Sequence, residues 1–192
     1  ATHLAAQGHR VFGSSRRPLP DQGRVRMLVL DVTDEALVEQ AVAQVISEAG
    51  RIDVLINNAG VGLCGAVEDT TLAEAQWQMD TNFFGTVRMI RAVLPQMRRQ
   101  GRGRIITVSS LAGLAGLPYQ PYYSASKYAL EGLHEALRGI FETQLFNTLA
   151  VFLGNAAPHI FALIVALLGM NQAEAQDFRG NIRRESLAMA IA

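Results

Sequence analysis

The residue types and spacing that could do chemistry stand in YYSASKYALEGL, residues 122–133, which contains the single lysine of the chain. Lys127 follows Tyr123 by four residues, so a helix would place the phenol and the ammonium on one face. A free phenol has a pKa of about 10, and a nearby cation lowers it by favouring the phenolate. Such a tyrosine could give a proton to a carbonyl oxygen or take one from an alcohol. The alternative is a surface tyrosine beside a solvated lysine.

The use of lysine at this one position favours the functional interpretation, because arginine supplies every other strong base of the chain. Lysine carries a compact charge with three rotatable donors, which can bond the hydroxyls of a sugar while staying close to a phenol. The planar fork of arginine does not replace it easily. Tyr122 and Tyr128 have no lysine at the same spacing, and we interpret them as core residues or cleft walls.

A serine hydroxyl is expected near this pair. Ser110 precedes Tyr123 by thirteen residues and closes the apolar run RIITVSS. Open α/β sheets bind ligands just outside the carboxyl ends of their strands, so this hydroxyl could bond the oxygen that Tyr123 protonates. Ser109 is the competing choice, because side chains alternate between the two faces of a strand. A loop serine is otherwise often only a turn former.

The elements that must position these groups alternate between short apolar runs and amphipathic helices, a pattern typical of βαβ units and a parallel sheet. The predicted strands are RVFGSS (10–15), RMLVLDV (26–32), IDVLINNAG (52–60), RIITVSS (104–110) and TLAVFL (148–153). Several are apolar on both faces, as strands covered by helices on each side must be. We therefore predict an α/β fold: a Rossmann-like, doubly wound parallel sheet in three αβα layers.

Four helices are predicted between and around these strands. The chain opens with ATHLAAQG, an apolar helical pattern that ends at Gly8, and residues 34–49 form an amphipathic helix that stops at Gly50. A helix beginning near Thr71 has capping-box spacing to Glu74 and runs toward Gly101, with a bend or interruption expected at Pro95. The last predicted helix spans residues 122–142 and carries the tyrosine and the lysine.

Composition excludes several classes of function. The chain has 192 residues, is 49% hydrophobic, and has a formal net charge of +0, which does not suit a polyanion or an anionic membrane. We expect no nucleic-acid partner. The single cysteine, Cys64, cannot form an internal disulfide and fits a reducing compartment, so a cytoplasmic location is expected. No cluster of His, Cys and carboxylates indicates a metal site.

No membrane span is expected. The apolar segment PHIFALIVALLGM, residues 158–170, would reach about 20 Å as a helix, whereas a bilayer core is about 30 Å thick. We interpret it as a buried helix or a subunit contact.

Four motifs, in order and spacing, resemble the classical short-chain dehydrogenases/reductases: NNAG (57–60), Asn82 in MDTNFFGT, the serine pair at 109 and 110, and YSASK (123–127). The resemblance covers residues 1 to about 142. It implies a dinucleotide-binding oxidoreductase that interconverts a carbonyl compound and an alcohol. Relatives of this kind are commonly homodimers or homotetramers.

The resemblance also assigns roles to single residues. Tyr123 is similar to the proton donor, and Lys127 to the group that lowers the tyrosine pKa and binds the nicotinamide ribose. Ser110 corresponds to the residue that orients the substrate oxygen. Asn82 resembles the helix residue whose main chain holds a water of the proton relay, the alternative being a helix-interior amide bonded to backbone.

Further positions resemble those that line the cofactor. In NNAG these are Asn57, Ala59 and Gly60, whereas Asn58 could instead tie the central strands together. Asp31 is similar to the acceptor for the adenine amino group, with Val32 beside the ring. The alternative for Asp31 is an N-cap for the next helix.

Cofactor preference depends on the residues at the end of the strand RVFGSS and just after it. An acidic residue there would bind the ribose hydroxyls of NAD, but this chain has Ser14, Ser15, Arg16 and Arg17. Guanidinium beside small hydroxyls accommodates a 2′-phosphate. We therefore expect NADP(H), with NAD(H) as the alternative, and we assign Ser15 and Arg16 to the site; Arg17 is more typical of a solvated loop.

The segment 109–133 also resembles members that act on hydroxysteroids, retinoids and other lipophilic substrates. The apolar residues of its loop could wall a substrate pocket or simply pack the loop: Leu111, Leu114, Leu117 and Pro118. His134 is interpreted as a surface residue rather than a catalytic one.

The sequence departs from the family pattern at both ends. The family's first strand and glycine-rich turn are expected to be missing, and the Pro-Gly strand end expected after residue 142 reads TLAVFLGNAAPHIF. We expect one dinucleotide-binding domain over 1–192, incomplete at its N-terminus, with a divergent segment at 143–192. The rival hypothesis is a catalytically inactive protein of this fold that serves as a scaffold or interaction partner.

Overall fold

The structure is a computed structural model that describes residues 1–141, 146–152 and 187–191. The strands are β1 (Arg10–Ser15), β2 (Val25–Val29), β3 (Val54–Asn57), β4 (Gly103–Ser109), β5 (Phe146–Phe152) and β6 (Leu187–Ile191). The helices are α1 (Thr2–Ala6), α2 (Glu35–Ala49), α3 (Leu72–Met79), α4 (Gly85–Gln100) and α5 (Pro121–Phe141). A π-helical segment, η1 (Asp80–Phe84), joins α3 to α4, and a 3₁₀ turn, η2 (Leu111–Gly113), follows β4.

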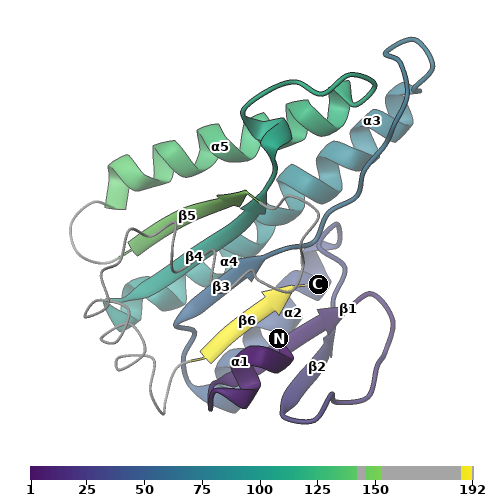
Figure 1. Ribbon diagram of the computed structural model, residues 1–192. Coiled ribbons are helices and arrows are strands. Elements are labelled where there is room, and N and C mark those ends of the chain that lie inside the picture. The colour runs from purple at the N-terminus through teal and green to yellow at the C-terminus, as the bar shows by residue number, and fades with distance from the viewer. Residues whose placement is uncertain (142–145, 153–186, 192) are drawn as a thin grey trace.

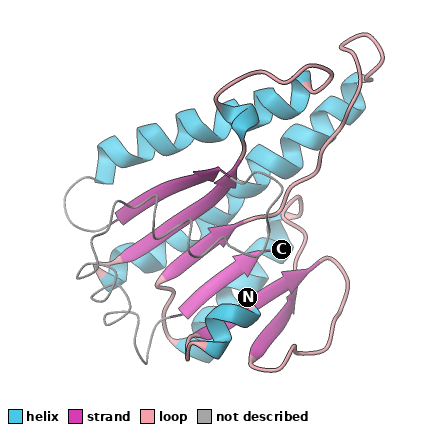
Figure 2. Ribbon diagram, in the orientation of Figure 1, coloured by secondary structure: helices cyan, strands magenta, loops and turns pink. Residues whose placement is uncertain are grey.

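The six strands form one sheet in the order β2-β1-β6-β3-β4-β5, and every pair is parallel. This confirms the predicted parallel α/β sheet. In Figure 2 the loops that follow β1, β3 and β4 leave the sheet at the same edge, where the strand arrows point. Ligands of open α/β sheets bind at that edge. The topology therefore brings NNAG, the two serines and the start of α5 to one side of the molecule.

The centre of the sheet contains a strand that the sequence did not predict. β6 lies between β1 and β3, with Ala188 opposite Val11 and Val54 in the two ladders (Figure 1). In the doubly wound strand order this central position belongs to the first strand of the domain. Residues 187–191 thus stand where the strand expected to be missing would lie.

Helices cover both faces of the sheet. Figure 1 shows α1 on the near side and α2 and α4 behind. The larger core lies between the sheet and α2 and α4, where Phe12, Leu55 and Met89 are fully buried. A smaller cluster of Ala5, Val11 and Val25 lies under α1. The neighbours Val11 and Phe12 belong to different clusters because successive strand residues face opposite sides of the sheet.

Local signals in the sequence account for the helix ends. Asp34 caps α2 by accepting a hydrogen bond from the Leu37 N–H, and Gly50 ends it in the left-handed conformation with φ of 76°. The predicted capping box of Thr71 and Glu74 begins α3. The interruption expected at Pro95 is wrong, because α4 remains helical through Pro95 to Gln100.

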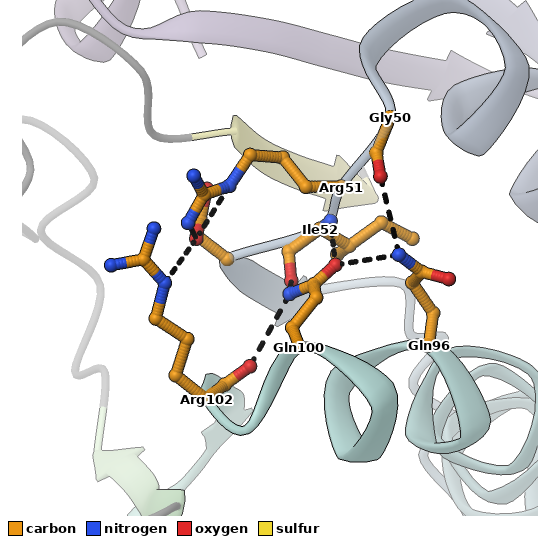
Figure 3. A network of polar contacts seen from close by, with 7 residues as sticks. Gly50, Arg51, Ile52, Gln96, Gln100 and Arg102 are labelled. Carbon is orange, nitrogen blue, oxygen red and sulfur yellow. Dashed lines mark hydrogen bonds and ion pairs between the residues drawn. The ribbon is translucent and has the colours of Figure 1, made fainter.

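Polar contacts fix β3 against the end of α4, at the edge of the sheet opposite the ligand edge (Figure 3). The Gln100 side chain accepts a hydrogen bond from the Ile52 N–H and donates one to the Ile52 carbonyl, both at 2.8 Å. Gln96 donates to Gln100 and to the Gly50 carbonyl. These bonds satisfy the backbone that enters β3, so the strand and α4 are held together away from the candidate site.

Candidate functional site

Tyr123 and Lys127 lie on one face of α5, as their spacing predicted. The Lys127 Nζ atom is 5.6 Å from the centre of the Tyr123 ring. It also donates a 3.0 Å hydrogen bond to the carbonyl of Val108 in β4. Lys127 is only 6% exposed, whereas Tyr123 is half-buried. The alternative of a solvated lysine beside a surface tyrosine is therefore wrong for the lysine.

Burial changes the ionisation of this lysine. Desolvation lowers the pKa of Lys127 to about 8, and the nearby charge of Glu131 partly offsets that effect. Near neutral pH most of the lysine is still an ammonium. A cation therefore lies close to the phenol, which is the arrangement that makes a tyrosine a better proton donor.

The two serines after β4 occupy different environments. Ser109 is buried at 3% exposure, and its hydroxyl has no hydrogen-bond partner within the described residues. Ser110 is half-buried at the start of η2, where its Oγ accepts a hydrogen bond from the Ala112 N–H at 3.2 Å. Ser110 is thus the serine nearer the surface at the strand end. Its role toward substrate remains a prediction.

Asn82 lies in η1 and is 1% exposed. Its amide accepts from the Val61 N–H at 2.8 Å, donates to the Val61 carbonyl at 2.9 Å, and donates to the Ser126 hydroxyl at 3.0 Å. Asn82 therefore links the loop after β3 to the helix that carries Tyr123 and Lys127. The amide is bonded to backbone, as the alternative interpretation expected, but to the backbone of another loop.

The main chain at Asn82 has the geometry of a π-bulge, a feature found frequently at functional sites. The Asn82 carbonyl accepts a hydrogen bond from the Thr86 hydroxyl at 3.1 Å.

Gln78 is a positioning residue that the sequence analysis missed. It is fully buried one helical turn before Asn82, and its Oε1 accepts a 2.7 Å hydrogen bond from the Leu63 N–H. Gln78 and Asn82 together hold the segment 61–63 against α3 and η1. Their i, i+4 spacing was the available signal, because such residues share a helix face.

The two loops that flank the ligand edge are joined directly. The Gly65 N–H donates a 2.8 Å hydrogen bond to the carbonyl of Tyr119, whose φ of 59° is unusual for a residue other than glycine. Leu111, Leu114 and Leu117 lie in the second loop and are 60%, 61% and 37% exposed. This exposure argues against the alternative that these leucines pack the loop, and their role as a pocket wall stays a prediction. We call these three leucines the apolar rim.

The residues assigned to the adenosine end lie at the end of β1 and in the loops that follow β1 and β2. Arg16 is exposed and Ser15 is half-buried, with the Ser15 hydroxyl accepting from the Arg17 N–H. Asp31 accepts hydrogen bonds from the backbone and the hydroxyl of Thr33 at 2.9 and 2.7 Å. Burial opposes ionisation of Asp31, but these bonds and the charge of Arg16 lower its pKa overall. The N-cap alternative is wrong, because Asp34 caps α2.

Val32 is held close to the start of α4. It is 6% exposed, and a Cβ atom added at Gly85 would lie 2.6 Å from its side chain. Only glycine allows this approach. Arg88, one turn further along α4, donates to the Val32 carbonyl and forms an ion pair with Asp80.

The NNAG residues stand at the carboxyl end of β3. Asn57 is 4% exposed and donates to the Thr107 hydroxyl in β4 at 3.2 Å, so Asn57 ties the central strands together. The expectation that Asn58 does so is wrong, because Asn58 is exposed. Ala59 packs against the large core, and Gly60 is exposed beside the Asn82 side chain.

The chemistry of these groups fits parts of a dinucleotide. The Oδ1 of Asn57 and the Oγ of Ser14 are buried without hydrogen-bond partners in the described residues, at the strand ends that flank β6. Such unsatisfied acceptors suit hydroxyl donors of a sugar. Lys127 fits the ribose next to the tyrosine. Within the described ranges no glycine-rich turn lies between the two regions.

The remaining features of the described residues concern metal ligands, the cysteine and membrane-spanning helices. They include no group of three or more His, Cys, Asp or Glu side chains that could hold a metal ion. Cys64 is exposed. None of the helices in the described ranges has the length and apolar character needed to cross a bilayer. The apolar segment 158–170 lies outside the described residues.

His134 is not a surface residue, contrary to expectation. It is 2% exposed, and neither ring nitrogen has a hydrogen-bond partner in the part that the structure describes. Burial lowers its pKa to about 4, so the ring is neutral near pH 7. The helix spacing explains the position, because His134 lies one turn after Leu130, which is buried.

A comparison with protein families identifies the class of protein. The model of the short chain dehydrogenase family matches residues 1–156, and the chain therefore belongs to the short-chain dehydrogenases. The family binds nicotinamide dinucleotides, and the relatives of the chain are oxidoreductases. This confirms the family and the Rossmann-like fold expected from the motifs.

Individual relatives are similar over most of this chain. The chain is 58% identical over 137 residues to a 3-ketodihydrosphingosine reductase of Bacteroides thetaiotaomicron, covering 71% of this chain and 51% of that protein. It is 43% identical over 134 residues to human 17-beta-hydroxysteroid dehydrogenase type 1, covering 70% and 40%. The chain thus spans about half the length, or less, of these two relatives.

A crystal structure of a short-chain dehydrogenase from Streptomyces avermitilis has a similar fold. The TM-score is 0.74 at 29% sequence identity, and the match covers 100% of this chain and 82% of the other. The sheet and its flanking helices therefore have the arrangement of a solved member of the family.

Proposed function

We propose that the protein is an NADP(H)-dependent oxidoreductase that interconverts a ketone or aldehyde and an alcohol. The observation that carries this proposal is the buried ammonium of Lys127, 5.6 Å from the Tyr123 ring on one face of α5. A phenol next to a cation can exchange a proton with a carbonyl oxygen or an alcohol near neutral pH. The family membership supports the same reaction class.

The dinucleotide supplies the hydride when it is bound, and the side chains of this chain supply the proton and the orientation. Tyr123 would give its proton to the carbonyl oxygen during reduction and take it back during oxidation. Ser110, at the start of η2, would donate a hydrogen bond to the same oxygen and orient it. Lys127 would bind the ribose hydroxyls and hold its positive charge beside the tyrosine.

The proton leaving or reaching Tyr123 needs a path. The Asn82 main-chain carbonyl lies in the π-helical segment η1, and it would hold a water between Lys127 and solvent. Its amide fixes the loop at Val61, so the same residue would also keep the cleft in shape.

The preference for NADP(H) is proposed from the loop after β1. Arg16 is exposed, and its charge contributes to lowering the pKa of Asp31. Ser15 is the neighbouring residue in the sequence. A 2′-phosphate would accept hydrogen bonds from both side chains. Asp31 and Val32 would contact the adenine, and Asn57, Ala59 and Gly60 would line the adjoining ribose and phosphate.

A lipophilic substrate is proposed from the apolar rim. Leu111, Leu114 and Leu117 are exposed beside the serine and tyrosine loops. The names of the two relatives, a 3-ketodihydrosphingosine reductase and a 17-beta-hydroxysteroid dehydrogenase, are consistent with a substrate of this kind.

We propose a single dinucleotide-binding domain and a cytoplasmic homodimer or homotetramer. The support for self-association is the exposed aromatic surface of Trp77 in α3 and Phe84 in η1, which are seven residues apart and 45% and 49% exposed. The second candidate function is a noncatalytic partner of the same fold. It is favoured by β6, which takes the central position next to the expected pyrophosphate site.

The test is a titration of NADPH fluorescence followed by turnover with a panel of ketones. We expect binding, and we expect turnover to fall by a factor of ~100 to 10,000 in Tyr123→Phe while NADPH affinity stays nearly the same. Tyr128→Phe, in which an exposed tyrosine on the same helix loses its hydroxyl, is the matched control. Failure to bind NADPH would favour the noncatalytic partner, and full turnover in Tyr123→Phe would remove the proposed proton donor.

A further inference from the structure

The inner side of α5 carries a half-buried carboxylate, with one buried oxygen, that the proposed reaction does not use. Glu131 lies one helical turn after Lys127, and its Oε1 is buried without a hydrogen-bond partner among the described residues. Buried polar atoms are normally hydrogen-bonded, so an exception calls for a physical reason. Glu131 is therefore a candidate for a role beyond helix formation.

The close contact between η2 and α5 fixes the place of this carboxylate. A Cβ atom added at Gly113 would lie 3.2 Å from the Glu131 Cγ, 3.2 Å from the Lys127 carbonyl and 3.0 Å from the Ser109 Oγ. The Glu131 stem is thus confined between the 3₁₀ turn after β4 and the backbone of Lys127. Its charge is held near Lys127 by packing, without a direct hydrogen bond.

The other charged and titratable groups around Lys127 do not replace Glu131. The elements η2 and β5 contain no ionisable side chain. Arg104 lies at the far end of β4, and Glu74 is held in its capping box with Thr71. In η1 the carboxylate of Asp80 is paired with Arg88.

On α5 itself, Tyr123 is neutral in its protonated form, and burial lowers the pKa of His134 so that its ring is neutral near pH 7. Glu131 is the charged side chain whose field acts against the desolvation of Lys127.

We propose that Glu131 is a positioning residue that keeps Lys127 as an ammonium directed at the Val108 carbonyl and at the tyrosine. The effect of this role on catalysis rests on the proposed function, whereas the lysine titration that tests the role does not. An i, i+4 carboxylate in a partly buried site interacts with an ammonium more strongly than it would in water. Without it, burial of Lys127 would be less well compensated, and more of the lysine would be neutral near pH 8.

The single lysine of the chain permits a direct measurement. Protein labelled with ¹³C at lysine gives one side-chain signal, whose pH titration reports on Lys127 without cofactor or turnover. We expect a midpoint near pH 8 in the unchanged protein and a midpoint lower by at least about 0.5 pH unit in Glu131→Gln. An unchanged midpoint in Glu131→Gln would overturn the proposal.

Two further variants make the result specific. Glu135→Gln removes an exposed carboxylate on the next turn of α5 and should leave the midpoint in place. Glu131→Asp keeps the charge and should hold the midpoint within about 0.3 pH unit of the unchanged protein. If Glu131→Gln does not fold, the Glu131→Asp variant decides the question. A midpoint lowered by about 0.5 pH unit or more in Glu131→Asp, which keeps the charge, would contradict a role for that charge.

Measurement of turnover provides a second, separate test. At pH 8 we expect kcat for carbonyl reduction to fall at least about twofold in Glu131→Gln relative to Glu135→Gln, with KM for the ketone little changed. Equal kcat values despite a shifted titration would contradict the catalytic consequence. A shifted titration without turnover in any variant, the unchanged protein included, would support the electrostatic role and count against the proposed function.

Discussion

The ammonium of Lys127 donates a hydrogen bond to the Val108 carbonyl and lies 5.6 Å from the centre of the Tyr123 ring. The backbone of β4 therefore orients the cation toward the phenol before any ligand binds. This preorganisation connects the sheet to the chemistry, because the strand that ends at the two serines also holds the lysine.

The ionisation of Lys127 should limit carbonyl reduction at high pH. Because burial lowers the lysine pKa to about 8, the ammonium is present below that pH and is lost as the pH rises through it. We expect kcat/KM for reduction to fall above about pH 8, as measured by initial rates between pH 6 and 9.5. A flat profile to pH 9.5 would contradict a requirement for the charged lysine.

Arg16 should select the phosphorylated cofactor. Arg16→Ala is expected to weaken NADPH binding by about tenfold or more and NADH binding by less than about twofold, since a charged hydrogen bond contributes about 1.5–3 kcal/mol. Arg17→Ala is the control, because its side chain is the neighbouring exposed guanidinium. Fluorescence titration with both nucleotides gives the comparison, and equal losses for the two nucleotides would refute the assignment.

His134 should make the folded state sensitive to acid. Its pKa is lowered to about 4 by burial, so the unfolded chain binds more protons than the folded one between about pH 6.5 and 4. Stability from the neutral ring is complete above pH 6.5 and is lost as the pH falls toward 4. Urea unfolding should show roughly 2–3 kcal/mol less stability at pH 4.5 than at pH 7 from this group.

His134→Leu should remove that component of the pH dependence, and His3→Leu, a change at an exposed histidine, should leave it. The same acid sensitivity in His134→Leu and in the unchanged protein would assign the effect to other groups.

The absence of a side chain at Gly85 should be needed for Val32 to pack against the start of α4. A Cβ atom at this position would lie 2.6 Å from the Val32 side chain, so Gly85→Ala must move the helix or the valine. We expect a loss of about 1–3 kcal/mol in the free energy of unfolding, together with weaker NADPH binding. In the matched change Gly132→Ala the new methyl group meets nothing within 4 Å, and this helical position should be stabilised by about 0.5–1 kcal/mol. Equal stabilities of the two variants would contradict the close approach.

The central strand β6 should be sensitive to proline. Ala190 pairs with Gly13 on one side and Ile56 on the other. Ala190→Pro removes a backbone donor in the middle of the sheet and should cost about 3 kcal/mol or more, measured by chemical denaturation. Ala190→Gly keeps the donor and should cost about 0.5–1 kcal/mol. If both variants were as stable as the unchanged protein, β6 would not contribute to the sheet in solution.

Much of the fold could be predicted because its signals are local. The strand Arg10–Ser15 has the predicted bounds, and Gly50 and Thr71 mark helix ends through turn and capping chemistry. β2 and β3 end at Val29 and Asn57, earlier than predicted, because the polar residues after them turn into ligand-edge loops. β5 begins two residues before its predicted start.

Features that depend on distant contacts could not be predicted. Residues 187–191 have an apolar pattern that fits several structures, and only pairing with β1 and β3 makes them a strand. The π-bulge at Asn82 could not be predicted either, since nothing in the local periodicity of the sequence distinguishes it from an α-helix. The burial of His134 could have been predicted, because its spacing from Leu130 places it within the apolar stripe of α5.

The candidate site divides in the same way. The Tyr123 and Lys127 pair follows from helix geometry and is present as predicted. The spacing of Gln78 and Asn82 puts them on one helix face, but their contacts with the loop at 61–63 depend on how that loop folds back on the helix, so the sequence did not indicate the partners.

The place of β6 has a consequence for how the molecule assembles. In the described sheet, the strands β1 and β2 on one side and β3, β4 and β5 on the other are hydrogen-bonded to each other through β6, which is remote in sequence from its partner Val11. Contacts of such long sequence separation form late and slow the search for the native state. The two halves of the sheet should therefore acquire protection from hydrogen exchange separately during refolding, with the ladder between them the last to become protected.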